Sequence, residues 1–348
     1  MTWDELLAEF RALGGVAENV TLGNGPFGRG VFVVDAARSA TLHAPENLLV
    51  PTDALEIRDG RMKVKPGAPL GDRERAFFEA YHANFCWSAG VFGEIQASQK
   101  AWSELPGDVV HAIKTMGALL DPEVRFLPPT TEVCFYQFVR SRDAKYQGRL
   151  CMLPVVDLVN HSSRASPYVL TNGIGVTGHF TGEMLVRYNG RDSWSNALTY
   201  GFAELASFAY SIGIGVDLFG RYQLSVRRDV AEVEFREGAG FPIVKLDGNA
   251  IDLSFLLLGH YAATDVPRGM FRSVMAPYLS LAEADQVFDS IAHFNRLKFL
   301  NLVRLLRGHD GTIVRMLESA ALDQLEILSG CVGSRDFSPA AGALLRKI

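Results

Sequence analysis

The chain has 348 residues, of which 48% are hydrophobic and 21% are charged. This composition excludes a disordered chain or a small scaffold, and the length predicts roughly two domains at about 150 residues each. The 34 lysines and arginines nearly balance the 39 aspartates and glutamates, for a net charge of −5. No basic stripe of the kind typical of nucleic-acid binders is visible, so we expect no nucleic-acid partner.

The compartment and the metal content are expected from what the chain lacks. Its N-terminus is acidic and helical in pattern, unlike a secretory signal, which predicts a cytoplasmic protein. The longest apolar stretch, around 255–263, is far short of the ~20 residues of a membrane span, so we expect no membrane association. Without a C-x-x-C pair, the four widely spaced cysteines predict free thiols and no metal site. They are Cys86, Cys134, Cys151 and Cys331.

The first third of the chain alternates in pattern. Thr2 and Glu5 form a capping box that predicts a helix ending near Leu13. Residues 20–57 hold β-rich runs broken by Gly, Pro and Asn, which predicts short strands joined by turns. From 72 to 120 the apolar residues recur at helical spacing with few breakers, which predicts a helical insertion.

Strands are predicted again at 132–140, 151–159, 168–180 and 183–188, followed by a helix at about 195–209. Beyond residue 220, two strand-like segments at 221–228 and 231–238 precede a mostly helical region. Two long helices there are marked by apolar residues near one face, namely Val287, Ile291, Phe294, Leu297 and Leu305 in the first and Ile313, Leu317, Ala321 and Leu325 in the second.

Residues 23–28 read Gly-Asn-Gly-Pro-Phe-Gly and match the dinucleotide-binding pattern G-x-G-x-x-G. That fingerprint needs a strand before it and a helix after it, whereas a strand-like GVFVV follows here. A Rossmann site is therefore disfavoured. Two interpretations stay open: a glycine-rich hairpin turn, or a loop whose backbone at 27–30 approaches a ligand closely.

The densest polar cluster, at 157–162, directly follows an apolar run. Polar groups that end a buried strand need partners or a ligand, although a satisfied turn would also explain them. A Ser-His-Asp triad is disfavoured, because His161 and Ser162 would point to opposite faces of an extended chain.

Other motifs gain meaning from their order. These are FGRG at 27–30, Ser141-Arg142, PVVDLVNHS at 154–162, Glu183 five residues before Tyr188, and YGF at 200–202. The set resembles the SET-domain methyltransferases, specifically the branch of the Rubisco large-subunit lysine methyltransferase. The D-x-x-N-H-S string followed by the tyrosine and YGF is its most specific part.

The resemblance implies an α+β fold with a SET-domain β scaffold of small sheets. In this family the NHS segment threads through a loop to form a pseudoknot. The SET domain would span 1–215, with a helical insertion at about 66–135, and a mostly helical substrate-binding domain would span 216–348.

The resemblance also implies S-adenosylmethionine as the cofactor and Tyr188 as the active-site tyrosine. It places Asp157 and Tyr168 on the substrate side. The residues implied to bind the cofactor are Phe27, Gly28, Arg29, Arg142, Asn160, His161, Tyr200, Gly201 and Phe202. The sequence departs from the family at Asp143-Ala144, where family members carry an aromatic after the SR pair, and Tyr168 matches its family counterpart only loosely.

The implied reaction is methylation of a lysine side chain of a protein or peptide substrate. Methyl transfer from a sulfonium is an in-line displacement that requires a neutral amine held in place, and it requires no metal. Alternatives are a histidine, a small amine or peptide metabolite as acceptor, or a non-catalytic peptide-binding module. The sequence predicts neither the acceptor's identity nor the number of methyl groups added nor the oligomeric state.

Overall fold

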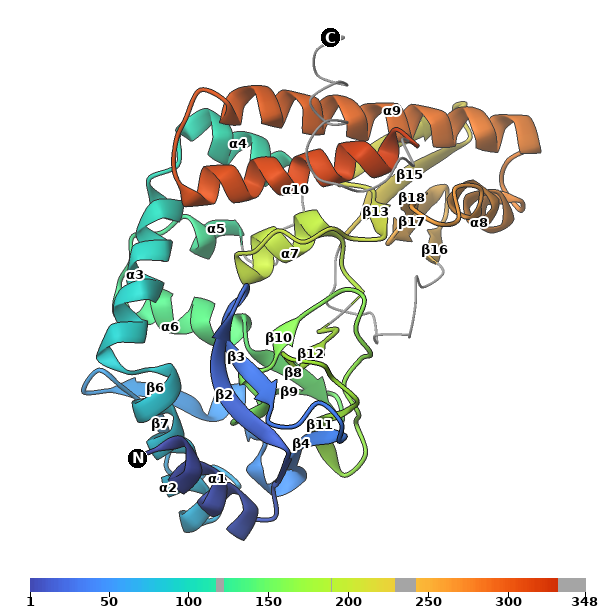
Figure 1. Cartoon of the computed structure of the whole chain (residues 1–348). Coiled ribbons are helices and arrows are strands. Elements are labelled where there is room, and N and C mark those ends of the chain that lie inside the picture. The colour runs from blue at the N-terminus through green and yellow to red at the C-terminus, as the bar shows by residue number, and fades with distance from the viewer. Residues whose placement is uncertain (117–121, 189, 229–241, 331–348) are drawn as a thin grey trace. The chain divides into compact units, whose positions relative to one another are not determined.

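The computed structural model describes residues 1–116, 122–188, 190–228 and 242–330. The chain forms two compact units: unit 1 contains 1–100 and 127–189, and unit 2 contains 101–126 and 190–348 (Figure 1). The structure thus groups 101–126 and 190–215 with the C-terminal residues. The predicted SET and substrate-binding domains, divided at residue 215, stay a prediction.

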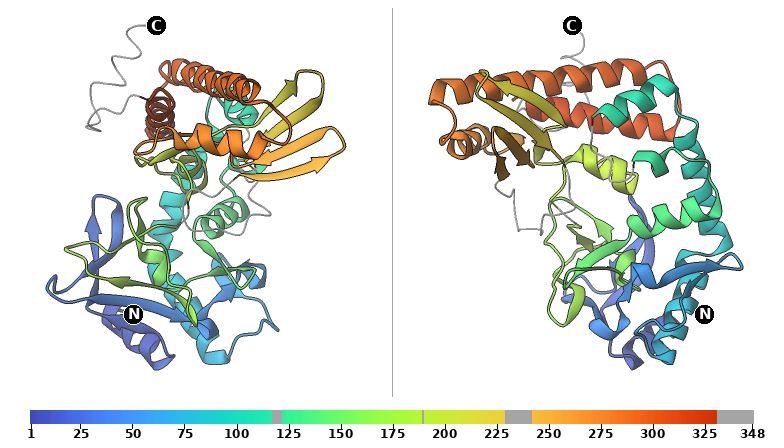
Figure 2. Two further views of the ribbon diagram at one scale, coloured as in Figure 1. Left: turned by 90° about the vertical axis from the view of Figure 1, so that its right-hand side faces the viewer. Right: turned by 180° about the vertical axis from the view of Figure 1, so that it is seen from behind.

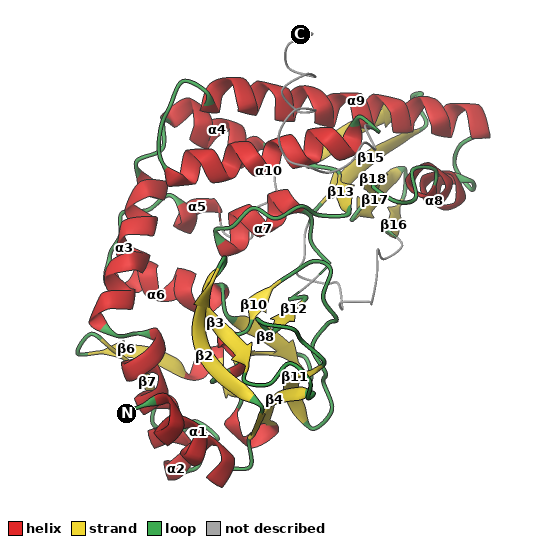
Figure 3. Cartoon of the chain, viewed as in Figure 1, coloured by secondary structure: helices red, strands yellow, loops and turns green. Residues whose placement is uncertain are grey.

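Unit 1 carries small separate sheets of two or three strands (yellow in Figure 3). The sheet orders are β1-β4-β11, β2-β3, β5-β9-β8, β6-β7 and β10-β12. Its strands are β1 (Val16–Glu18), β2 (Val20–Gly25), β3 (Gly28–Val33), β4 (Ala40–Pro45), β5 (Val50–Pro51), β6 (Leu55–Arg58), β7 (Arg61–Val64), β8 (Asp143–Tyr146), β9 (Arg149–Met152), β10 (Asn160–His161), β11 (Gly173–Gly178) and β12 (Leu185–Val186).

Helices surround these sheets in the chain order of unit 1. They are α1 (Trp3–Ala12), α2 (Asp72–Tyr81), α3 (Ala89–Ser103), whose residues 101–103 belong to unit 2, and α6 (Thr131–Arg140). Short turns of helix are η1 (Glu46–Leu48), η2 (Thr52–Ala54), the π-helical η3 (His82–Cys86) and η4 (Val156–Leu158). One apolar core runs through the unit.

The predicted N-terminal helix is confirmed, together with its cap. The Thr2 hydroxyl accepts from the Glu5 amide at 3.2 Å, and the Glu5 carboxylate accepts from the Thr2 amide at 2.7 Å. This reciprocal pair satisfies two backbone donors that would otherwise lack partners at the start of α1. The helix buries Leu6, Leu7 and Phe10.

The predicted strand at 132–140 is wrong, because these residues form α6. The Thr130 hydroxyl caps the helix by accepting from the Val133 amide at 3.3 Å. The segment buries Cys134, Phe138 and Val139, which lie close together on a helix surface but alternate poorly along a strand.

Unit 2 combines helices with two sheets, ordered β14-β15-β17-β16 and β13-β18. Its helices are α4 (Gly107–Thr115), α5 (Pro122–Arg125), α7 (Ser193–Tyr200), α8 (Val266–Met275), α9 (Leu281–Leu306) and α10 (Thr312–Leu328). Its strands are β13 (Phe208–Tyr210), β14 (Ile214–Leu218), β15 (Tyr222–Arg227), β16 (Ile243–Asp247), β17 (Ala250–Ser254) and β18 (Leu257–His260). Figure 2 shows α9 and α10 side by side.

The predicted α+β class, with small sheets and a helical C-terminal region, is confirmed. The strand at 221–228 is present as β15, and the predicted strand at 231–238 lies outside the described residues. Strands β16 to β18 were not predicted. The helix expected to reach 209 ends at Tyr200, because Gly201 adopts φ +79°, a left-handed conformation that stops a helix.

Three of the four cysteines, Cys86, Cys134 and Cys151, are buried free thiols, and Cys331 lies outside the described residues. Within the described ranges, no three His, Cys, Asp or Glu side chains cluster as a metal site would require. No described helix has the length and apolar character needed to cross a membrane.

Candidate functional site

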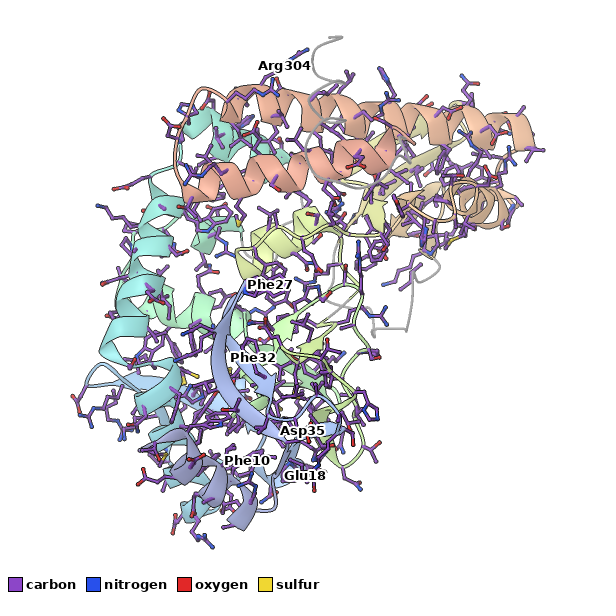
Figure 4. All side chains as sticks on the ribbon, in the orientation of Figure 1. Phe10, Glu18, Phe27, Phe32, Asp35 and Arg304 are labelled. Carbon is purple, nitrogen blue, oxygen red and sulfur yellow. The ribbon has the colours of Figure 1, made fainter. Side chains whose placement is uncertain are left out.

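The glycine-rich motif at 23–28 forms a β-hairpin. Strands β2 and β3 pair antiparallel, Gly25 faces Gly28, and the two-residue turn consists of Pro26 and Phe27. Gly28 has φ +89°, which favours glycine. Phe27 lies 55% exposed at the tip of the hairpin (Figure 4). The hairpin interpretation is therefore confirmed and the Rossmann geometry is excluded.

A strained turn leads into the 157–161 segment. Val155 is fully buried and has φ +71°, which a β-branched residue rarely adopts. Such a conformation costs about 1–3 kcal/mol and persists only where the surrounding structure imposes it. The predicted strand at 151–159 accordingly ends at Met152, and the chain turns through η4 before it enters β10.

Asn160 connects three segments that are far apart in the sequence. Its side-chain Nδ2 donates to the Arg29 carbonyl oxygen on β3 at 3.2 Å and to Glu183 Oε1 at 2.6 Å. In addition, β10 pairs in parallel with β12, which places Asn160 opposite Leu185. The NHS segment and the segment before Tyr188 therefore lie side by side against the hairpin.

Tyr188 closes over the same segment. Its backbone amide donates to His161 Nδ1 at 3.0 Å, and its hydroxyl donates to the Val159 carbonyl oxygen at 2.7 Å. The two ring centroids of His161 and Tyr188 are 5.0 Å apart. Accepting at Nδ1 fixes the tautomer of a neutral His161 ring, with its proton on Nε2.

Tyr168 stacks against Tyr188. The two rings are parallel within 1°, and their centroids are 6.1 Å apart. Both side chains are half-buried. Two of the residues implied by the resemblance for the active and substrate sides therefore form one aromatic wall.

Arg142 and Asp157 form a second cluster at the start of this segment. The Arg142 Nε lies 3.8 Å from Asp157 Oδ2, and the Asp157 Oδ1 accepts from the Tyr81 hydroxyl. Burial raises the pKa of the Asp157 carboxyl to about 6, and the Arg142 charge opposes this rise. Burial and the adjacent Asp157 charge raise the pKa of Tyr81. Asp157 is thus buried within the protein, and its predicted role towards substrate stays a prediction.

His82 lies fully buried next to this cluster, in the π-helical turn that follows α2. Its ring centroid lies 4.3 Å from that of Phe78 and 5.9 Å from that of Phe138. Neither ring nitrogen has a hydrogen-bond partner among the described residues. Burial, helped by the Arg142 charge, lowers the pKa of His82 to about 3, so the ring stays neutral in the folded protein well into the acid range.

We expect His82 to make the protein acid-sensitive. The unfolded chain binds a proton at an ordinary histidine pKa of about 6.5, whereas the folded chain does so only near 3, so stability is lost as the pH falls through this interval. Between pH 7.5 and 5, His82 therefore costs about 2 kcal/mol of unfolding free energy. In H82F, whose ring fits among the same aromatic neighbours, that loss should be absent.

Urea denaturation of wild type and H82F at both pH values measures this difference. An exposed histidine, His309, provides the matched control variant H309Q. If the gap in unfolding free energy between wild type and H82F is the same at pH 5 and pH 7.5, the neutral buried ring is not the source of the acid sensitivity.

The remaining predicted residues lie elsewhere. Tyr200, Gly201 and Phe202 belong to unit 2, at the C-terminal end of α7, where the two rings stack with centroids 5.9 Å apart. Their place at a cofactor pocket stays a prediction. Arg29 lies on β3, and its guanidinium donates to the Phe85 carbonyl oxygen.

Sequence reasoning left two contributors without a role. Glu183 entered only through its spacing from Tyr188, yet its carboxylate contacts Asn160 directly. Tyr81 lay in a segment recognised only as helical, although its hydroxyl binds Asp157. The glycine spacing held a signal for Glu183, because Gly25 and Gly30 leave space for another side chain beside the hairpin.

No protein-family model and no curated protein matches the chain. Among solved structures, the chain is similar to the SET domain of LSMT bound to lysine and AdoHcy, with 12% identity over 99% of this chain and 98% of that chain and a TM-score of 0.45. It is also similar to Rubisco LSMT bound to sinefungin and monomethyllysine, with the same identity and coverage and a TM-score of 0.42. The function proposed below rests on residues and distances within this chain.

Proposed function

We propose that this chain is a SET-domain methyltransferase that uses S-adenosylmethionine to methylate a lysine side chain of a protein. The observation that carries the proposal is the meeting of separate motif residues in unit 1. Asn160 contacts Arg29 of the hairpin, and its neighbour His161 contacts Tyr188. These contacts join segments that the motif resemblance alone had related.

The side chains present fit the cofactor's charged groups. Both acceptors at Asn160 Nδ2 leave the amide oxygen as an acceptor, which suits an ammonium group. The Arg142 side chain, 29% exposed, supplies a cation for a carboxylate. A Cβ at Gly28 would meet no atom within 4 Å, so the hairpin turn leaves room for a ligand beside its backbone.

When bound, the cofactor supplies an electrophilic methyl group on a sulfonium. The acceptor lysine must be neutral to attack it, and at about pH 7.4 exposing the free amine costs roughly 4 kcal/mol for an ordinary pKa of about 10.4. The paired rings of Tyr168 and Tyr188 exclude water from one side, and desolvation lowers an amine's pKa.

Tyr188 is the residue we assign to orienting the amine. A hydroxyl has one proton, and Tyr188 donates it to the Val159 carbonyl oxygen. Any further hydrogen bond at the Tyr188 oxygen is therefore one that the oxygen accepts. An amine N–H is a suitable donor, so the bond would aim the nitrogen lone pair away from the tyrosine and towards the methyl group.

The proposal is tested by titrating the purified protein with S-adenosylmethionine in a calorimeter, after confirming that no cofactor copurifies. Wild type should bind one equivalent. N160A should bind at least about tenfold more weakly, because a hydrogen bond to a charged group contributes about 1.5–3 kcal/mol.

The matched control is N84A, which removes an exposed asparagine of unit 1 whose amide contacts only the nearby Ala80 carbonyl oxygen in the described contacts. N84A should bind as wild type does. No heat of binding from cofactor-free wild type would overturn the proposal and favour a peptide-binding module. Tritiated S-adenosylmethionine offered with lysine peptides, histidine peptides and free amines then identifies the acceptor class.

A further inference from the structure

The carboxylate of Glu183 occupies a niche formed by two glycines of the hairpin. A Cβ built on Gly30 would collide with Glu183 Oε1 and would lie 2.6 Å from Asn160 Nδ2. A Cβ built on Gly25 would lie 2.7 Å from Glu183 Oε2. Side chains at these two positions would displace the carboxylate, so the glycine pattern has a steric function that is separate from turn formation.

The backbone holds Glu183 in this niche from both sides. The Val33 amide donates to the Gly182 carbonyl oxygen at 2.9 Å, and the Met184 amide donates to the Val31 carbonyl oxygen at 2.8 Å. Glu183 itself forms an antiparallel bridge with Phe32. The side chain therefore projects from a backbone that is fixed to β3.

The contacts of Asn160 determine which way its amide faces. Its Nδ2 meets two groups that can only accept, the Arg29 carbonyl oxygen at 3.2 Å and Glu183 Oε1 at 2.6 Å. A flipped amide would set its oxygen against both of these oxygens and lose both hydrogen bonds. The amide oxygen must therefore face away from Glu183.

We propose that Glu183 is a positioning residue that locks the Asn160 amide so that its oxygen accepts from the ammonium group of the ligand. This inference rests on the proposed function. Glu183 Oε2 is buried and has no hydrogen-bond partner among the described residues, so one oxygen of the carboxylate is committed to Asn160 and the other to no described donor. A purely structural carboxylate would gain more by using both oxygens.

A double-mutant cycle tests whether Glu183 acts through Asn160. We expect E183A to weaken binding of S-adenosylmethionine about tenfold, and E183Q, which keeps an acceptor oxygen, to stay within about threefold of wild type. In the N160A background, E183A should add less than about twofold, because the residue that it positions is already gone. The control E18A removes an exposed carboxylate on β1 and should bind as wild type does.

Calorimetry at ligand concentrations up to the millimolar range reads each corner of the cycle, and thermal melting reports whether each variant is folded. Effects of E183A and N160A that multiply, or wild-type affinity in a folded E183A protein, would overturn the inference while leaving cofactor binding intact. Failure of wild type to bind would instead overturn the proposed function.

A readout without ligand keeps the two questions separate. In NMR spectra of asparagine-labelled protein, assigned with N160A, the Asn160 side-chain NH2 should show slowly exchanging, inequivalent protons in wild type and in E183Q. Averaged, fast-exchanging protons in E183A would support the lock. An unchanged Asn160 NH2 signal in E183A would contradict it.

Discussion

Replacing Tyr188 by phenylalanine is expected to lower the rate of methyl transfer at least about 100-fold while changing the affinity for S-adenosylmethionine less than threefold. The phenylalanine keeps the ring that stacks on Tyr168, so the aromatic wall persists. What is lost is the oxygen that accepts from the amine, and a misplaced nucleophile costs about two orders of magnitude in rate. Single-turnover transfer of tritium to the acceptor found with wild type measures the effect.

The control for this prediction is Y146F, which alters a buried tyrosine on β8 of the same unit. It should transfer at the wild-type rate. Y188F also frees the Val159 carbonyl oxygen, so a melting curve accompanies each rate. Near-normal transfer by Y188F would remove Tyr188 from the role assigned to it and return the question of which group orients the amine.

The second large effect is expected in unit 2, where R228M should lower the free energy of unfolding by about 3–5 kcal/mol. Arg228 and Asp192 are almost completely buried, and their closest contact is 2.5 Å. The guanidinium also donates to the carbonyl oxygens of Ser211 and Tyr210. Removing the cation leaves a buried carboxylate without its counter-charge, which is the costly half of breaking such a pair.

Asp192 has a further role that sharpens the test. As the N-cap of α7 its Oδ1 accepts from the Ser195 amide at 2.9 Å, and an asparagine could still do so. The double variant D192N/R228M should therefore be more stable than R228M, since no unpaired charge stays buried.

Urea denaturation at pH 7.5 compares these proteins with R227M. Arg227 precedes Arg228 in the chain and pairs with Asp252 at the surface, with both side chains about half exposed, so its loss should cost less than about 1 kcal/mol. Equal losses from R227M and R228M would show that the burial of the pair does not determine its contribution.

The sequence allowed the site to be anticipated where a motif is local and left it open where the geometry is not. The strings around Asn160 and Tyr188 identified residues that meet in unit 1. No local pattern could show that Glu183 would bind Asn160, because that contact depends on the pairing of β10 with β12. The burial of Asp157 depends likewise on Tyr81, 76 positions earlier in the chain.

The fold shows the same division. The capping box at Thr2 fixed the start of α1 from four residues, whereas 132–140 was misassigned because its β-branched and aromatic residues outweighed a weak helical stripe. In α9 the predicted apolar face included Leu297, which is 51% exposed. The buried face instead includes Asn295, whose amide oxygen accepts from the Ile212 amide, a contact that hydrophobicity cannot reveal.

The pairing of β10 with β12 also determines when the site exists. Only two residues on each strand form this pair, and Asn160 reaches back 131 positions to Arg29. Closing such a loop costs entropy before the contact returns any free energy, so it forms late in folding. A nascent chain cannot complete the site until residue 188 has left the ribosome. In the mature protein, a local opening of these four residues would release a ligand while both cores stay folded.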